Sequence, residues 1–149
     1  ERAAALACQV LDRLEGVGVF CLELFQLPGG ELLINEIAPR PHNSGHYTLD
    51  ACSVSQFEQQ VRAVSGLPLG EVRLLSPAVM VNLIGDDAAM MMKGTGCRAL
   101  LDIPGAALHL YGKRTIRPRR KMGHITFLGE SFDQALDRAE QFRRTMHDH

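Results

Sequence analysis

The feature that most restricts the fold is a Pro28-Gly29-Gly30 segment between two apolar stretches. Residues 19–27 and 31–37 are rich in branched and aromatic side chains, a composition that is typical of strands. A short connection of Pro and Gly reverses the chain, so the two stretches are predicted to pair as an antiparallel hairpin. The sequence therefore predicts a two-stranded unit close to its N-terminal end.

This hairpin is predicted to place two carboxylates opposite each other. If the turn is centred on Gly29-Gly30, counting outward sets Phe25 opposite Ile34 and Glu23 opposite Glu36. Opposed like charges destabilise a strand pair by up to about 1 kcal/mol, and a cation between them reverses the effect. Mg²⁺ suits such a pair, because it binds one or two carboxylates together with water and phosphate oxygens. The alternative is a solvated edge pair with the turn one residue out of register, and the spacing alone leaves both open.

The rest of the chain alternates between the periodicities of helices and strands. Ser55 is a candidate N-cap, because Glu58 follows it at the spacing of a capping box. Residues 86–101 fit either type of element. Helices are predicted at residues 3–14, 55–65 and 131–146, and further strands at residues 78–84, 107–111 and 125–128. This order predicts an α+β chain with mostly antiparallel strands.

The composition excludes several classes of protein. The chain has 149 residues, of which 46% are hydrophobic, enough for an ordinary core and too many for a disordered chain. A formal net charge of −1 argues against binding nucleic acid by bulk electrostatics, and no apolar run approaches the roughly 18 residues of a membrane span. The four cysteines never form a Cys-x-x-Cys pair, which excludes a zinc ribbon. Cys8 and Cys21 are predicted to be small core residues in a reducing, cytoplasmic compartment.

A loop rich in polar groups follows the hairpin. The guanidinium of Arg40 suits bidentate binding of an anion, and Asn43 and Ser44 add an amide and a hydroxyl. His42 and His46 have a spacing found in zinc sites, but such pairs lie on helices with Glu between them. We therefore expect the two imidazoles either to bind a substrate or to hold the loop, and both roles remain open.

A basic segment runs from Lys113 to Lys121 between two predicted strands. A segment of this kind is either a solvated turn or a contact for a phosphorylated substrate. No aromatic residue lies inside it after Tyr111, so base stacking, which nucleic-acid binding uses, is not supported.

Three segments resemble the N5-carboxyaminoimidazole ribonucleotide synthase family, the ATPase subunit of phosphoribosylaminoimidazole carboxylase. Residues 32–48 read LLINEIAPRPHNSGHYT, residues 55–58 read SQFE and residues 120–124 read RKMGH. Asn-Glu is common to ATP-grasp enzymes, whereas the His-Asn-Ser-Gly-His loop is specific to this family. Family members commonly carry Gly where this chain has Arg119, so the geometry of that turn is left open.

The resemblance implies the end of an ATP-grasp domain at residues 1–75, an antiparallel sheet with helices. It also implies a small β-rich C-terminal domain at residues 76–149, similar to a rudiment single hybrid motif. By resemblance, Glu23 and Glu36 would bind Mg²⁺, while Asn35 and Glu36 would belong to the ATP site. This agrees with the separate argument from the hairpin spacing.

The implied reaction is an ATP-dependent carboxylation in purine biosynthesis. Bicarbonate is phosphorylated to carboxyphosphate, and its carboxyl group passes to the exocyclic amine of 5-aminoimidazole ribonucleotide. The resemblance implies that Arg40 and His42 are catalytic and face these substrates. The other implied substrate-binding residues are Asn43 and Ser44 in the loop, and Arg120 and Lys121 near the ribonucleotide phosphate.

The family's enzymes are much longer than this chain and are commonly dimeric. The glycine-rich loop and the lysines that hold ATP are expected upstream, in an N-terminal half that would be this chain's partner. Alone, the chain is expected not to turn over ATP, because positioning groups around the phosphates is most of the catalysis. The rivals are another ATP-grasp ligase, such as glycinamide ribonucleotide transformylase or biotin carboxylase, and a non-catalytic remnant that binds a nucleotide or mediates oligomerisation. The His-Asn-Ser-Gly-His loop argues against both rival ligases.

Overall fold

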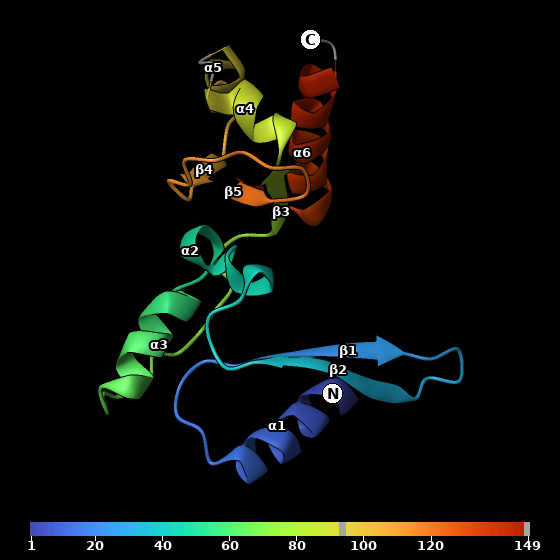
Figure 1. Cartoon of the computed structure of the whole chain (residues 1–149), viewed down its shortest axis with the longest axis vertical. Helices are drawn as coiled ribbons and strands as arrows, with labels where there is room; N and C mark the ends of the chain where they lie inside the picture. Colours follow the sequence, from blue (N-terminus) through green and yellow to red (C-terminus); the bar gives the residue numbers. More distant parts are fainter. Residues whose placement is uncertain (93–94, 148–149) are drawn as a thin grey trace. The chain divides into compact units, whose positions relative to one another are not determined.

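The computed structural model describes residues 1–92 and 95–147, and the chain divides into two compact units (Figure 1). Unit 1 comprises Glu1–Leu49 and Val54–Val72, and unit 2 comprises Asp50–Ser53 and Arg73–His149. Across the described ranges, no helix combines the length and the apolar character that a membrane crossing requires.

Unit 1 is a helix and a hairpin followed by a loop and a second helix. Its elements are α1 (Arg2–Leu14), β1 (Cys21–Gln26), β2 (Leu32–Ala38), the 3-10 turn η1 (Asn43–Gly45), α2 (Thr48–Ala51), which continues into unit 2, and α3 (Gln56–Val64). The predicted helices at the start of the chain and after Ser55 are confirmed. Ser55 is the N-cap, because its hydroxyl accepts the Glu58 N–H at 3.1 Å.

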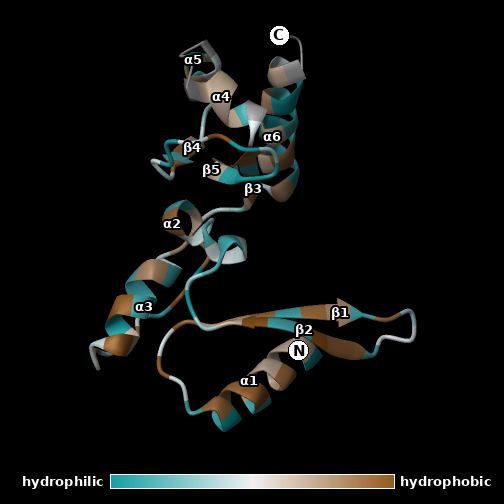
Figure 2. Ribbon diagram, viewed as in Figure 1, coloured by the Kyte–Doolittle hydropathy of each residue, from teal (hydrophilic) through white to brown (hydrophobic). Residues whose placement is uncertain are grey.

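Hydrophobic residues occur along both α1 and the hairpin of unit 1 (Figure 2). Among them Leu14, Phe25 and Leu33 are exposed. None of the residues of α1 is buried. Cys8 is exposed and Cys21 is half-buried, so the prediction that both are core residues is wrong. It failed because apolar neighbours in sequence do not make a core unless another element covers them.

The hairpin turn is one residue longer than predicted. The Leu27 N–H donates to the Glu31 carbonyl at 2.9 Å, and the Gly30 N–H donates to the Leu27 carbonyl at 2.8 Å. Three residues thus form the loop, with Gly30 in the left-handed region at φ 79°. Pairs near the turn are shifted by one residue from the prediction, as in Phe25 opposite Leu33.

A β-bulge restores the predicted carboxylate pair. The register shifts between Glu23 and Leu24, so that Asn35 is the extra residue on β2 and Glu23 pairs with Glu36. The predicted opposition of the two carboxylates is confirmed, although the pairing from which it was counted is wrong beside the turn.

Unit 2 is a three-stranded antiparallel sheet with helices, in the strand order β3-β5-β4. The helical residues within 86–101 resolve the ambiguity of that segment. The strand predicted at residues 125–128 begins earlier, at Lys121, and is the central strand. The elements are β3 (Ala78–Ile84), α4 (Asp86–Met92), α5 (Thr95–Leu101), β4 (Ala106–Leu110), β5 (Lys121–Leu128) and α6 (Phe132–His147). The mixed helices and antiparallel sheets confirm the predicted α+β class.

The core of unit 2 lies between its central strand and its helices. Ile125 and Phe127 on β5 are fully buried, as is Leu100 on α5. The rings of Phe127 and Phe142 lie 5.8 Å apart, centroid to centroid, which packs α6 against the sheet. Among the described residues, unit 2 therefore has a larger hydrophobic core than unit 1. This core supports the two strands that flank the basic segment.

We expect Leu100→Ala to lower the free energy of unfolding of unit 2 by about 2–5 kcal/mol, because it leaves a cavity in this core. Leu101→Ala is the matched control, since Leu101 is 62% exposed and its loss should change stability by about 0.5 kcal/mol or less. Urea unfolding followed by circular dichroism measures both, because the chain has no Trp for fluorescence. Equal losses for the two variants would contradict the described core.

Candidate functional site

The hairpin and the loop after it bring four polar side chains of unit 1 together. Asn35 Nδ2 donates to Glu23 Oε2 at 3.3 Å, and His42 Nε2 lies 3.5 Å from Glu23 Oε1. On its other side, His42 Nδ1 lies 3.0 Å from the Ser44 hydroxyl. Glu23 is thus a shared partner of the bulge residue and of the loop.

The contacts of His42 indicate which ring nitrogen carries the proton. The Ser44 backbone N–H donates to His42 Nδ1 at 3.4 Å, which makes Nδ1 an acceptor. A neutral imidazole has one accepting and one donating nitrogen, so Nε2 carries the proton and faces the Glu23 carboxylate. This arrangement directs the Nε2–H of the imidazole toward the Glu23 carboxylate.

Gln56 holds the loop, a role that the sequence analysis did not identify. Its side-chain carbonyl accepts the His42 N–H at 2.9 Å, and its Nε2 donates to the His42 carbonyl at 2.8 Å and to His46 Nδ1 at 2.7 Å. The Thr48 hydroxyl donates to the Gly45 carbonyl at 2.6 Å and accepts the Gln56 N–H at 3.0 Å. The SQFE segment was the available signal, but its spacing did not indicate these long-range contacts.

The contacts of His46 favour a loop-holding role over a zinc site. His46 Nδ1 accepts from Gln56, and the His46 ring lies 5.3 Å from that of Phe57. Within residues 1–92 and 95–147, the group of three or more His, Cys, Asp and Glu side chains close enough together to hold one ion consists of Asp50, His109 and His124. The His42–His46 pair is not among them.

Among the other residues of the predicted site, Arg40 and Glu36 are exposed and Asn43 is half-buried. Arg40 is exposed and its Nη1 donates to the Pro41 carbonyl at 3.1 Å. Asn43 begins the turn η1, and Glu36 is exposed on β2. Unit 1 therefore presents a carboxylate pair, an imidazole and a guanidinium on neighbouring segments.

The predicted phosphate contacts Arg120 and Lys121 belong to unit 2. Arg120 Nη1 donates to the Thr115 carbonyl at 3.0 Å, and Lys121 is exposed at the start of β5. Arg119 adopts φ 62°, the left-handed conformation that Gly accepts without strain. The turn thus keeps a glycine-like backbone without a glycine.

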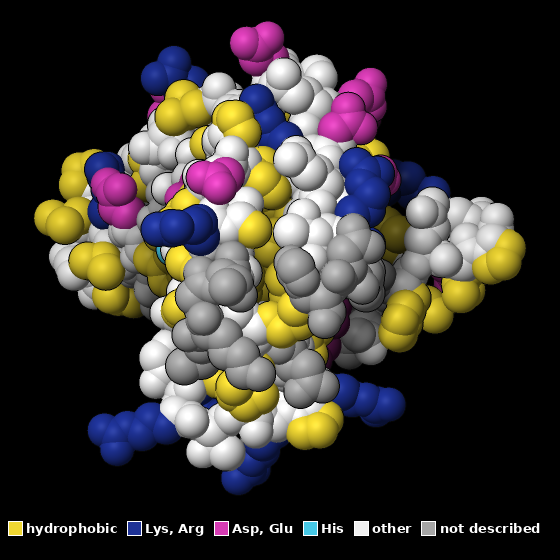
Figure 3. Space-filling model, turned by 90° about the horizontal axis from the view of Figure 1, so that it is seen from above, with side chains coloured by type: hydrophobic (Ala, Val, Ile, Leu, Met, Phe, Trp, Pro, Cys, Tyr) yellow, Lys and Arg dark blue, Asp and Glu magenta, His cyan; other side chains and the backbone are white. Residues whose placement is uncertain are grey.

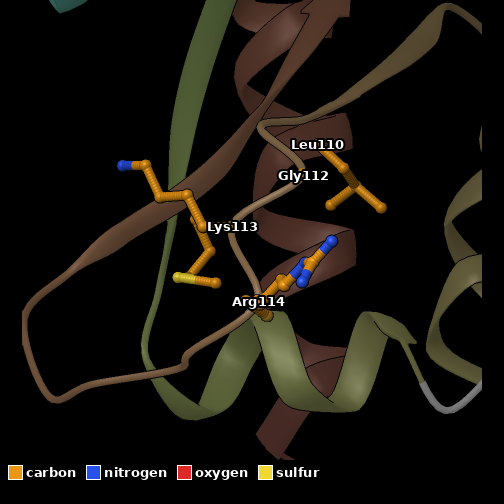
Figure 4. Close-up of a pocket in the computed structure, with 6 residues that line it drawn as sticks. Leu110, Gly112, Lys113 and Arg114 are labelled. Carbon is orange, nitrogen blue, oxygen red and sulfur yellow. The ribbon is translucent and has the colours of Figure 1, made fainter.

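Lys113, the first residue of the predicted basic segment, also belongs to this group. Its Nζ donates to the Lys121 carbonyl at 2.5 Å and lies 5.2 Å from the centroid of the Tyr111 ring. It also lines a pocket of about 210 Å³, with its side chain directed away from Leu110 and Arg114 (Figure 4). That volume is smaller than a typical ligand pocket, so the pocket is too small to enclose a nucleotide.

Charges of both signs share the molecular surface. Figure 3 shows one face, on which Lys and Arg side chains are interspersed with Asp, Glu and apolar side chains. This mixture agrees with the formal net charge of −1.

Two protein-family models match the chain. The ATP-grasp domain model matches residues 1–57, and the phosphoribosylaminoimidazole carboxylase C-terminal domain model matches residues 78–138. These matches define the class, an ATP-grasp protein with this type of C-terminal domain.

Curated relatives share about half of their residues with the chain over the matched part. The N5-carboxyaminoimidazole ribonucleotide synthase of Bacillus subtilis is 50% identical over 134 residues, which are 90% of this chain and 34% of that protein. The phosphoribosylaminoimidazole carboxylase of Candida albicans is 48% identical over 143 residues, which are 93% of this chain and 25% of that protein. The chain thus spans 34% and 25% of the lengths of these relatives.

Solved structures agree with these matches. N5-carboxyaminoimidazole ribonucleotide synthetase from Thermotoga maritima matches with a TM-score of 0.83 and 48% identity, over 95% of this chain and 40% of that one. The Aspergillus clavatus N5-carboxyaminoimidazole synthase in complex with ADP and 5-aminoimidazole ribonucleotide matches with a TM-score of 0.85 and 33% identity, over 98% of this chain and 39% of that one. The chain belongs to the N5-carboxyaminoimidazole ribonucleotide synthase family, as its motifs predicted.

We expect Gln56→Ala to loosen the loop, because it removes three side-chain hydrogen bonds to His42 and His46. Each such bond contributes about 1 kcal/mol, so the amides of Gly45 and His46 should exchange at least about tenfold faster. Hydrogen–deuterium exchange measures this, with Gln9→Ala on the exposed side of α1 as control. Unchanged exchange in the Gln56 variant would show that this side chain does not hold the loop.

Proposed function

We propose that this chain takes part in the ATP-dependent carboxylation of 5-aminoimidazole ribonucleotide by bicarbonate. In the first step, a bicarbonate oxygen attacks the γ-phosphorus of ATP and ADP leaves, which gives carboxyphosphate. In the second step, the exocyclic amine takes the carboxyl group, a proton leaves the nitrogen and phosphate is released. The observation that carries the proposal is the opposed Glu23–Glu36 pair beside His42, in a chain of this family.

The carboxylate pair fits a magnesium ion. Glu23 and Glu36 offer hard oxygen donors from opposed positions, and Asn35 keeps its amide oxygen available while its Nδ2 donates to Glu23. Mg²⁺ prefers such oxygens and completes its shell with water and phosphate oxygens. When bound, the ion would neutralise charge on the ATP phosphates. Asn35 and Glu36 would then form this chain's part of the ATP site.

The loop residues supply groups for the acyl substrate and the imidazole. Arg40 is exposed and always charged, so it can bind bicarbonate or carboxyphosphate in a bidentate manner. His42 is oriented by Glu23 and Ser44, which suits it to hold a proton beside the reacting amine. Asn43 and Ser44 would bind the same substrates through their amide and hydroxyl groups.

Arg120 and Lys121 would bind the ribonucleotide phosphate. Lys121 is exposed, and Lys113, which donates to its carbonyl, adds a third cation to the group. Lys and Arg bind phosphate through charge-assisted hydrogen bonds, which are about twice as strong as neutral ones. In this proposal, residues 1–75 contribute the end of the ATP-grasp domain and residues 76–149 the C-terminal domain, while the remaining ATP-binding groups come from the N-terminal half.

The proposal is tested in a chimera in which this chain replaces the matched 134 residues of the B. subtilis relative. We expect the chimera to consume 5-aminoimidazole ribonucleotide only with ATP, Mg²⁺ and bicarbonate. Glu36→Gln should lower its kcat/KM at least about 100-fold, because the variant loses a metal ligand. Glu31→Gln is the control, since Glu31 is exposed beside the turn of the same hairpin. A folded, inactive chimera would favour a non-catalytic remnant, and full activity of Glu36→Gln would contradict the metal site.

In the same chimera, Lys121→Gln should raise the KM for the ribonucleotide by about tenfold to 100-fold, with a smaller change in the KM for ATP. The reason is the loss of a charged hydrogen bond to phosphate, which contributes about 1.5–3 kcal/mol. Arg117→Gln, another exposed cation of the basic segment, is the control. Steady-state kinetics with each substrate varied in turn makes the measurement, and equal effects of both variants would indicate a general effect of charge.

A further inference from the structure

Unit 2 contains a second cluster of ionisable side chains, which the proposed carboxylation does not use. Asp50, His109 and His124 each offer one ligand atom, and these atoms all lie within 4.8 Å of one another. His109 Nε2 is 3.0 Å from Asp50 Oδ2 and 3.1 Å from Asp50 Oδ1. The cluster therefore combines two imidazoles and a carboxylate in one small volume.

The fold brings these residues together from three separate segments. His109 on β4 and His124 on β5 are direct partners in the antiparallel register, and their rings stack with centroids 4.5 Å apart. Asp50 lies on α2. The end of this helix is hydrogen-bonded to the segment that precedes β3, because the Leu75 N–H donates to the Ala51 carbonyl at 2.7 Å. Backbone pairing thus fixes all three residues within unit 2.

We propose that Asp50, His109 and His124 form a binding site for a divalent transition-metal ion of the Zn²⁺ type. Two imidazole nitrogens and one carboxylate oxygen are a donor set that such ions prefer over Mg²⁺. His124 is 1% exposed, whereas the side chains of His109 and Asp50 are 31% and 16% exposed. The ion can therefore enter from the side of Asp50 and His109 and keep a water as its fourth ligand.

The distances require only a local adjustment. With bonds of about 2.0–2.1 Å, ligand atoms on a tetrahedral zinc ion are about 3.4 Å apart. The His109 and Asp50 atoms are already at 3.0 Å, so the ion would replace their hydrogen bond. The other separations are at most 4.8 Å, so rotation of the imidazole rings has to bring these atoms closer by at most about 1.4 Å.

An outer partner supports one of the ligands. The Tyr111 hydroxyl lies 2.9 Å from His124 Nδ1 and restrains the orientation of that ring. Ligand histidines characteristically have such a hydrogen bond from the ring nitrogen that does not bind the metal. The cluster thus includes both ligands and a residue that positions one of them.

The test uses the chain stripped of metal with a chelator and then titrated with Zn²⁺ alone, or with Co²⁺ for visible spectra. We expect one equivalent of Zn²⁺ to bind, with two imidazoles and further oxygen, but no sulfur, in its X-ray absorption spectrum. His109→Gln and Asp50→Asn should each weaken binding at least about 100-fold, and Tyr111→Phe about tenfold. Circular dichroism checks that each variant is folded.

Glu36→Gln is the matched control, because it removes a carboxylate in unit 1 and should leave the Zn²⁺ affinity unchanged. Conversely, His109→Gln should leave Mg²⁺ binding at the hairpin unchanged, so failure of one site is distinguishable from failure of the other. The proposal is overturned if the folded wild-type chain binds less than one equivalent of Zn²⁺ or if sulfur is in its first shell. Unchanged affinity in both folded ligand variants would overturn it as well. If neither variant folds, the X-ray absorption spectrum of the wild-type chain decides, because two imidazole ligands without sulfur support the site and any other ligand set overturns it.

Discussion

One extra residue in a strand decides which way the carboxylates of the hairpin face. The three-residue loop by itself would set Glu23 opposite Asn35, and Glu36 would face the other side of the sheet, because side chains alternate along a strand. The bulge at Asn35 compensates for the longer loop and returns the pairing to Glu23 with Glu36. It also places the Asn35 amide beside Glu23. The candidate metal site, and through Glu23 the orientation of His42, depend on this single irregularity.

The loop after the hairpin depends on a helix that begins well after it in sequence. Ser55 caps α3 and so makes Gln56 its first residue, where the side chain reaches back to both the N–H and the carbonyl of His42. A loop with few backbone hydrogen bonds of its own is thereby held in one conformation. A local capping signal thus has a non-local consequence, since moving the start of the helix would move Gln56 away from the loop.

The sequence predicted most of the elements and the residues of the hairpin site, because periodicity, capping and turn composition are local signals. It could not choose between a two-residue and a three-residue turn, since Pro28-Gly29-Gly30 suits both. The motif resemblance identified the family that the comparisons confirm. The roles of Gln56 and of Asp50 beside His109 were missed, because each depends on pairing between segments distant in the chain. Burial failed similarly at Cys8, which is exposed although its apolar neighbours Ala7 and Val10 are half-buried.

The close contact between Gly45 and Gln56 limits how these two positions can change over evolution. A Cβ atom at Gly45 would lie 2.6 Å from Gln56 Oε1 and 2.9 Å from its Cδ, nearer than real contacts allow. The far end of Gln56 cannot move aside freely, because it holds His42 and His46. A side chain at position 45 therefore requires a shorter residue at position 56, so substitutions at the two positions are expected to occur together in divergent members of the family.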